Sequence, residues 1–250
     1  SMSLANRVDI IVSFLMESGV RMILTDLQRA LHRGVQVRIL TGNYLGITQP
    51  SALYLIKKEL GDRVDLRFYN DPSRSFHPKS YIFHRREVGE IYIGSSNLSK
   101  SALTSGIEWN YCFTSSRDPA NFAVFYHTFL DLFENHSIRI DREELARYSK
   151  SWHRPAVAKD LERYDLREEA EAPQTLFQPR GAQIEALYAL ENSRAEGAVR
   201  GLVQAATGVG KTYLAAFDST GYKRVLFVAH REEILQQAAV SFRNVRRSED

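Results

Sequence analysis

Apolar and polar residues alternate in short segments over the first 135 residues, with strand-like and helix-like spacing in turn. The predicted strands are 8–14, 35–40, 64–69, 76–83, 90–93 and 107–113, and the predicted helices are 20–32, 50–60 and 121–133. Gly34 and Gly61 follow the first two helices, where a glycine commonly ends a helix. The pattern predicts an α/β domain with a mixed sheet flanked by helices.

The pattern changes after residue 135. Charged residues crowd the segment 136–175, which lacks glycine, and Asp141 with Glu144 forms a capping box ahead of a polar helix. From residue 176 the apolar periodicity returns as a helix, strand, glycine-rich turn, helix and strand, at 183–190, 201–204, 205–211, 212–217 and 224–228. We therefore expect a domain at 5–135, a helical connector at 136–175 and the beginning of a second α/β lobe at 176–250.

Composition narrows the class of protein. Hydrophobic residues make up 44% of the 250 residues and charged residues 25%, which is typical of a globular protein. The single cysteine, Cys112, excludes a disulfide within the chain and predicts a cytoplasmic location. No apolar run reaches the roughly 20 residues that span a bilayer, so no membrane partner is expected. A net charge of +3 permits a nucleic-acid partner without requiring one.

The first group of candidate residues surrounds His77 and Lys79. Both lie on one face of the predicted strand 76–83, because side chains alternate along a strand. A histidine nitrogen can attack phosphorus while a lysine balances the negative charge that builds up on the phosphate oxygens. This pair therefore points to phosphoryl transfer.

Two later segments add polar groups to this site. Ser95 and Asn97 lie in a turn that opens a helix, where backbone amides bind anions. Glu108 lies on the opposite strand face from Ile107 and Trp109, and a carboxylate there can orient a histidine. The candidate catalytic residues are His77, Lys79, Ser95, Asn97 and Glu108.

The order of three motifs resembles the phospholipase D-like superfamily, in its nuclease branch. These motifs are His77-x-Lys79, Gly94-Ser95-Ser96-Asn97 and Gly106-Ile107-Glu108-Trp109-Asn110, and the resemblance covers about residues 5–135. It implies the phospholipase D-like fold, a phosphohistidine formed on His77, phosphate binding by Lys79 and Asn97, and catalysis that needs no metal.

The sequence departs from the family in two ways. The family pattern HxKxxxxD has an aspartate where this chain has His84, which we expect to be a surface histidine at a strand end, with Glu108 taking over the orienting role. Only one H-x-K motif occurs, whereas the reaction of this family uses two histidines on opposite sides of the phosphorus. We therefore expect a homodimer that pairs two His77–Lys79 motifs. The alternative is a half-built site that only binds phosphate. Arg74, Arg85 and Arg86 either track a nucleic-acid backbone or are solvated turn charges.

A second group of residues forms a phosphate-binding loop at 205–212. Its glycines let backbone amides approach phosphates, Lys211 reaches the β and γ oxygens, and the Thr212 hydroxyl is placed to ligate magnesium. The form Ala-x-Thr-Gly-x-Gly-Lys-Thr resembles superfamily 2 helicases and translocases, of the DEAD/DEAH type. The resemblance makes this part the start of a P-loop RecA-like lobe. The candidate nucleotide-binding residues are Gln183, Thr207, Gly208, Gly210, Lys211 and Thr212.

The resemblance assigns Gln183 to the adenine edge; a helix-surface glutamine is the alternative. His230 and Arg231 are equally consistent with contacts to a nucleic-acid strand and with an ordinary helix start. No Asp-Glu-x-His or Asp-Glu-x-Asp sequence follows the loop, although ATP hydrolysis in this family uses such a pair for magnesium and water. We expect the chain to be part of a longer helicase that binds ATP and magnesium, and to lack ATPase activity by itself.

Together these features predict a metal-independent nuclease coupled to an ATP-dependent translocase, acting on nucleic acid, with DNA favoured over RNA. Two alternatives remain open. In one, the first domain is a non-catalytic nucleic-acid clamp that recruits the helicase. In the other, it is a phospholipid phosphodiesterase.

Overall fold

The computed structural model describes residues 2–155, 158, 162 and 177–246. It divides into two compact units, Ser1–Ala170 and Glu171–Asp250, each of which is described by itself.

The first unit is built on a seven-stranded mixed sheet with the strand order β6-β5-β4-β1-β2-β3-β7. The strands are β1 (Arg7–Val12), β2 (Gln36–Thr41), β3 (Val64–Tyr69), β4 (Lys79–His84), β5 (Gly89–Gly94), β6 (Asn110–Thr114) and β7 (Ser137–Arg139). The first three strands are parallel, and the other four pair antiparallel with their neighbours. The predicted mixed α/β sheet is thus confirmed.

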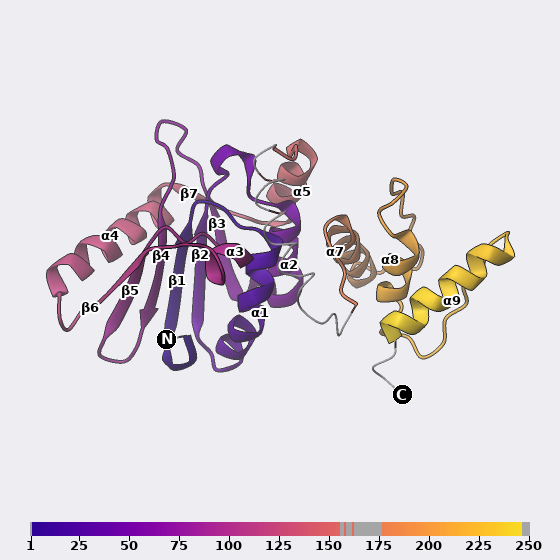
Figure 1. Cartoon of the computed structure of the whole chain (residues 1–250), viewed down its shortest axis with the longest axis horizontal. Coiled ribbons are helices and arrows are strands. Elements are labelled where there is room, and N and C mark those ends of the chain that lie inside the picture. Colours follow the sequence, from indigo (N-terminus) through magenta and orange to yellow (C-terminus); the bar gives the residue numbers. More distant parts are fainter. Residues whose placement is uncertain (1, 156–157, 159–161, 163–176, 247–250) are drawn as a thin grey trace. The chain divides into compact units, whose positions relative to one another are not determined.

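Helices cover both faces of this sheet (Figure 1). They are α1 (Glu17–His32), α2 (Pro50–Leu60), α3 (Lys100–Leu103), α4 (Pro119–Asn135) and α5 (Arg142–Ser151). Alternate residues of β1 serve the two faces. Ile11 packs with Phe129 and Phe133 of α4, whereas Ile10 faces Ile23 of α1.

Most predicted elements occur within a few residues of the expected bounds, and α2 and β3 match to the residue. Asp141 caps α5 by accepting a hydrogen bond of 2.8 Å from the Glu144 amide, as the capping box predicts. Strand β4 starts three residues later than predicted, because Pro78 has no N–H to donate to a sheet. Strand β7 was not predicted; its three residues pair with the edge of β3 inside the segment expected to be a helical connector.

The second unit contains helices α7 (Ala182–Ala195), α8 (Lys211–Asp218) and α9 (Glu232–Arg246). The strand predictions for 201–204 and 224–228 are wrong here, since both segments lack regular secondary structure. Leu202 is 94% exposed and Leu226 is 88% exposed, so neither side chain packs against a sheet neighbour. A strand needs several paired neighbours to be stable, and the described residues of this unit form no strand.

Across the described residues of both units, no helix has the length and apolar character needed to cross a membrane.

Candidate active site

The first group of candidate residues gathers at one end of the sheet. Val12, the last residue of β1, pairs with Lys79, the first residue of β4. At the same edge, Gly94 at the end of β5 pairs with Asn110 at the start of β6. The antiparallel pairing therefore brings residues that are far apart in the sequence to a common edge.

Lys79 and His77 are in direct contact. The Lys79 side chain is buried, with 7% of its surface exposed, while His77 is exposed. Lys79 Nζ lies 3.0 Å from both ring nitrogens of His77 and donates to its carbonyl oxygen at 3.0 Å. It also donates to Ser13 Oγ at 3.0 Å. The lysine thus anchors the exposed imidazole to the end of β1.

The surroundings of His77 disfavour its charged form. Partial burial, followed by the positive charge of Lys79, lowers the pKa of His77 below its ordinary value. Burial lowers the pKa of Lys79 as well, and the carboxylate of Glu108 acts against that change. A neutral imidazole has one unprotonated ring nitrogen, and a nucleophile requires such a nitrogen.

Asn97 fixes the backbone that carries Ser13. Its side chain is 7% exposed, and Oδ1 accepts hydrogen bonds from the amides of Ser13 at 3.1 Å and Phe14 at 3.4 Å. The turn lies directly on α1, because a Cβ added at Gly19 would lie 2.3 Å from the carbonyl atoms of Leu98. A glycine is therefore required at this position of the helix. The hydrogen bonds of Ser13 join Asn97 to Lys79.

Ser95 and Glu108 form a second pair beside the first. Ser95 Oγ donates to Glu108 Oε2 and accepts from the Trp109 amide at 3.0 Å. A Cβ at Gly94 would lie 2.0 Å from the Trp109 carbonyl oxygen, so only glycine allows the two segments to approach. Burial raises the pKa of Tyr81, and the nearby Glu108 carboxylate raises it further.

The structure thus brings all five predicted catalytic residues to one end of the sheet, in two hydrogen-bonded groups. His77, Lys79 and Asn97 are joined through Ser13, Ser95 is joined to Glu108, and the Glu108 charge acts on Lys79. Sequence reasoning missed Ser13, which bridges Lys79 and the Asn97 turn. The available signal was a small polar residue immediately after the apolar run that forms β1.

His84 is not the surface histidine that the sequence suggested. It lies at the other end of β4, with only 15% of its side chain exposed, and contacts Asp9 Oδ2 at 2.9 Å and Arg7 at 3.1 Å. Arg85 lies in the adjoining hairpin turn and is paired with Glu90 at 3.1 Å. Arg85 and Arg86 therefore belong to the end of β4 opposite the site, which removes the reason for assigning them a role beside it.

The predicted phosphate-binding loop of the second unit contains two glycines in the left-handed region and leads into a helix. Gly208 and Gly210 have φ angles of 89° and 79°, in the left-handed region, and Gly210 caps α8. Lys211 Nζ donates to the carbonyl oxygens of Ala205 and Ala206 at 3.1 and 3.0 Å. Gln183 Nε2 donates to the Val209 carbonyl at 2.9 Å, so this side chain is bound to the loop.

Comparison with protein families matches both parts of the chain. Residues 3–133 match the family described as "Cardiolipin synthase, PLD-like domain", and residues 176–250 match "Type III restriction enzyme, res subunit". The first match covers more than half of the 250 residues. The chain belongs to the phospholipase D-like family. Its first unit is a phospholipase D-like phosphodiesterase domain, and the second match is a helicase-type segment.

Several solved structures share features with the phospholipase D-like unit. NucT from Helicobacter pylori has 18% sequence identity and a TM-score of 0.41, over 56% of this chain and 86% of that one. Polyphosphate kinase from Porphyromonas gingivalis has 14% identity and a TM-score of 0.42, over 66% and 24% of the two chains. Phosphatidylserine synthase from Haemophilus influenzae has 15% identity and a TM-score of 0.42, over 66% and 40%. No curated protein matches the sequence.

Proposed function

We propose that the phospholipase D-like unit is a nuclease that cleaves phosphodiester bonds through a phosphohistidine on His77. The observation that supports it most directly is the contact between the Lys79 ammonium and both the exposed His77 ring and Ser13 Oγ, at 3.0 Å. A histidine and a fixed cation are thus adjacent at the end of the sheet where β4 begins and β1 ends. These are the two groups that phosphoryl transfer to a side chain requires.

The reaction proceeds in two balanced steps. In the first, a ring nitrogen of His77 forms a bond to phosphorus while the bond from phosphorus to the leaving oxygen breaks, and an acid protonates that oxygen. In the second, water attacks phosphorus, the phosphorus–nitrogen bond breaks, and the water proton passes to the same group acting as a base. Lys79 balances the charge on the non-bridging oxygens in both steps, and Asn97 holds the Ser13 segment in place.

The acid is the partner's His77 in a homodimer. One H-x-K motif supplies one histidine, whereas the reaction uses one histidine on each side of phosphorus. The exposed residues beside the site favour a second copy. Ile107 is 94% exposed, Trp109 84% and Tyr111 68%, and they lie on or next to β6, which ends the sheet. A row of exposed apolar residues at a sheet edge is a common interface with another chain.

Nucleic acid, and DNA in particular, is the substrate class we propose, because the same chain carries a helicase-type segment. A motor that moves along a strand delivers phosphodiester bonds to the nuclease site. The phosphate-binding loop fits a triphosphate, since it combines two left-handed glycines, a helix start and the Lys211 ammonium. A bound ATP with magnesium would supply the free energy for translocation once hydrolysed, which this chain by itself is not expected to do. Thr212 would hold the metal, and the Gln183 side chain is bound to the loop.

The proposal is tested by comparing wild-type protein with His77→Ala on single-stranded and duplex DNA, in the presence of EDTA. The wild type is expected to cut DNA with EDTA present, and the variant to lose cutting while still binding DNA. DNA binding without cutting by the wild type would instead favour a clamp. Activity confined to phospholipid vesicles would overturn the nucleic-acid assignment.

A further inference from the structure

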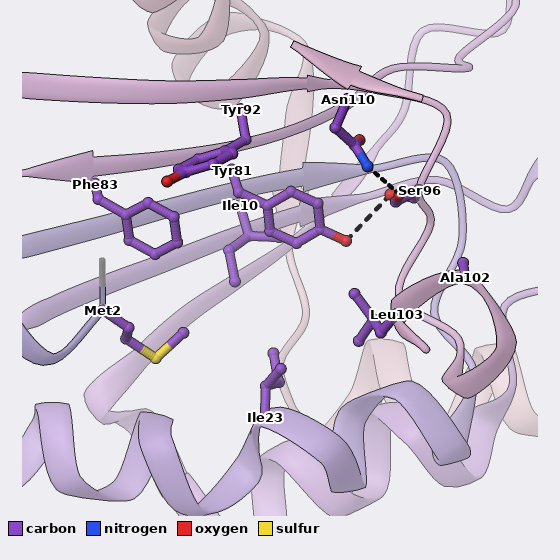
Figure 2. A pocket seen from close by; sticks show the side chains of 10 residues that line it. All are labelled: Met2, Ile10, Ile23, Tyr81, Phe83, Tyr92, Ser96, Ala102, Leu103 and Asn110. Carbon is purple, nitrogen blue, oxygen red and sulfur yellow. Dashed lines mark hydrogen bonds between the residues drawn. The ribbon is translucent and has the colours of Figure 1, made fainter. Parts of the chain in front are cut away.

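A slot next to the candidate site lies between the sheet and helices α1 and α3. It has a volume of about 430 Å³, which is in the range of small-ligand pockets. Figure 2 shows its sheet side formed by Ile10, Tyr81, Phe83 and Tyr92, and its helix side by Ile23 and Leu103. None of its ten lining residues carries a charge. The slot is therefore suited to a neutral, flat, largely apolar group.

The same segments build the site and the slot. Strand β4 contributes Lys79 to the site and Tyr81 to the slot, and both lie on one face of the strand, two residues apart. Two residues of a strand span about 6.6 Å. A sugar is long enough to connect a phosphate bound at Lys79 with a ring bound at Tyr81. The Glu108 carboxylate influences the pKa of both Lys79 and Tyr81, which places the two side chains in one electrostatic environment.

The polar end of the slot adjoins the turn formed by Ser95, Ser96 and Asn97. Ser96 lies between Ser95 and Asn97, and Tyr81 Oη donates to its carbonyl oxygen at 3.1 Å. Asn110 Nδ2 donates to Ser96 Oγ at 2.7 Å, as Figure 2 shows. Hydroxyl and amide groups therefore lie at one end of the slot and aromatic and aliphatic groups fill the rest. A nucleobase has this distribution, with polar edges and apolar faces.

We propose that this slot binds one nucleobase of the substrate strand, next to the phosphate that His77 attacks. The proposal rests on the nuclease function proposed above. Bases stack on aromatic side chains whatever their sequence, so Tyr81, Phe83 and Tyr92 would hold the strand without selecting a sequence. A base enters more readily from an unpaired strand, because a base in a duplex must first be unpaired and unstacked. The slot therefore makes single-stranded nucleic acid the preferred substrate.

The test uses the 250-residue protein and single-stranded oligonucleotides in which one base at a time, around the cleaved bond, is replaced by an abasic sugar. The expected result is one position at which loss of the base raises KM about tenfold to a hundredfold, the range that corresponds to one stacked base. Ile23→Trp fills the slot from α1 and is expected to raise KM for the intact strand by a similar factor. In this variant the abasic position no longer adds a further increase.

Met22→Trp is the matched control, because Met22 is the neighbouring residue of α1 and is 45% exposed. It is expected to leave KM unchanged. Leu103→Trp fills the slot from α3 and replaces Ile23→Trp if circular dichroism shows that the latter does not fold.

A wild-type protein that cuts DNA with equal KM at every abasic position, and filled variants with unchanged KM, would overturn the slot while leaving the nuclease intact. A wild type that cuts no nucleic acid would overturn the nuclease function itself. The two failures are therefore distinguishable.

Discussion

His84 Nε2 donates a hydrogen bond to Asp9 Oδ2 at 2.9 Å, joining β4 to β1 beneath α4. Asp9 is fully buried, and its other oxygen accepts from Arg38 Nε at 2.6 Å. His84 occupies the position of the family's usual aspartate, so the carboxylate at this end of β4 comes from the neighbouring strand instead. The Arg38 guanidinium lies 5.0 and 5.1 Å from the ring centres of Phe129 and Phe133, which ties the cluster to α4.

We predict that Asp9→Asn lowers the free energy of unfolding by about 3–5 kcal/mol, the cost of removing one partner from a buried ion pair. The asparagine keeps the shape but leaves Arg38 without its buried carboxylate partner. Urea unfolding followed by circular dichroism measures the difference. Glu134→Gln is the control, because Glu134 is 53% exposed and 3.8 Å from Arg38, and its loss is expected to cost less than about 1 kcal/mol.

The stabilisation by Asp9 also depends on pH. Burial raises the pKa of Asp9, but the hydrogen bonds from His84 and Arg38 outweigh it, and the net pKa is lowered. The contribution is therefore fully present above the unfolded-state pKa of about 3.9 and is lost as the pH falls through the lower folded-state value. The gap between wild type and Asp9→Asn should narrow below about pH 4. A gap that stayed constant in strong acid would contradict this assignment.

The sequence predicted this fold well where periodicity was local. The helix at Pro50–Leu60 and the strand at Val64–Tyr69 follow from spacing and flanking glycine alone. Ser13 lies 66 residues before Lys79 and Asp9 lies 75 residues before His84, and only the pairing of β1 with β4 brings them together. The segments 201–204 and 224–228 have strand-like sequences, but strand formation depends on neighbouring strands that periodicity does not specify.

The His77 ring should titrate below its ordinary value of about 6.5, because partial burial and the Lys79 charge both disfavour the imidazolium. Removing that charge in Lys79→Gln is expected to raise the pKa of His77 without restoring it fully, since burial is the larger cause. Nuclear magnetic resonance of the His77 ring protons across pH measures both values.

An unchanged or lower pKa in Lys79→Gln would show that the ammonium does not act on the imidazole. For the wild type, the lowered pKa means that His77 gains its proton at a lower pH than an ordinary histidine. The limb of the activity profile that requires the neutral form should therefore lie below pH 6.5.

The proposed homodimer leads to a prediction about mixtures of wild-type and variant protein. When wild-type protein is mixed with an excess of His77→Ala, its activity should fall more than dilution explains, because mixed dimers contain one histidine instead of two. Trp109→Lys is expected to give a monomer with little cleavage, since it places like charges at the exposed edge of both copies. Analytical ultracentrifugation and cleavage assays provide the two measurements.

Val124→Lys is the matched control for the dimer, because Val124 lies on α4 and is 61% exposed. It should remain dimeric and active. A wild type that is strictly monomeric and fully active would contradict the pairing of two His77–Lys79 motifs.

Lys211→Ala should weaken ATP binding by about one to two orders of magnitude, the effect of losing a hydrogen bond to a charged group. Lys211 Nζ is held by two neutral carbonyl oxygens, at Ala205 and Ala206, and a phosphate offers it a charged partner instead. A fluorescent ATP analogue measures the dissociation constants with magnesium present. Lys223→Ala is the control, because Lys223 lies outside the loop. Equal affinity of wild type and Lys211→Ala for the ATP analogue would show that Lys211 does not contact the triphosphate. ATP hydrolysis by the 250-residue wild type would contradict the expectation that this chain lacks ATPase activity.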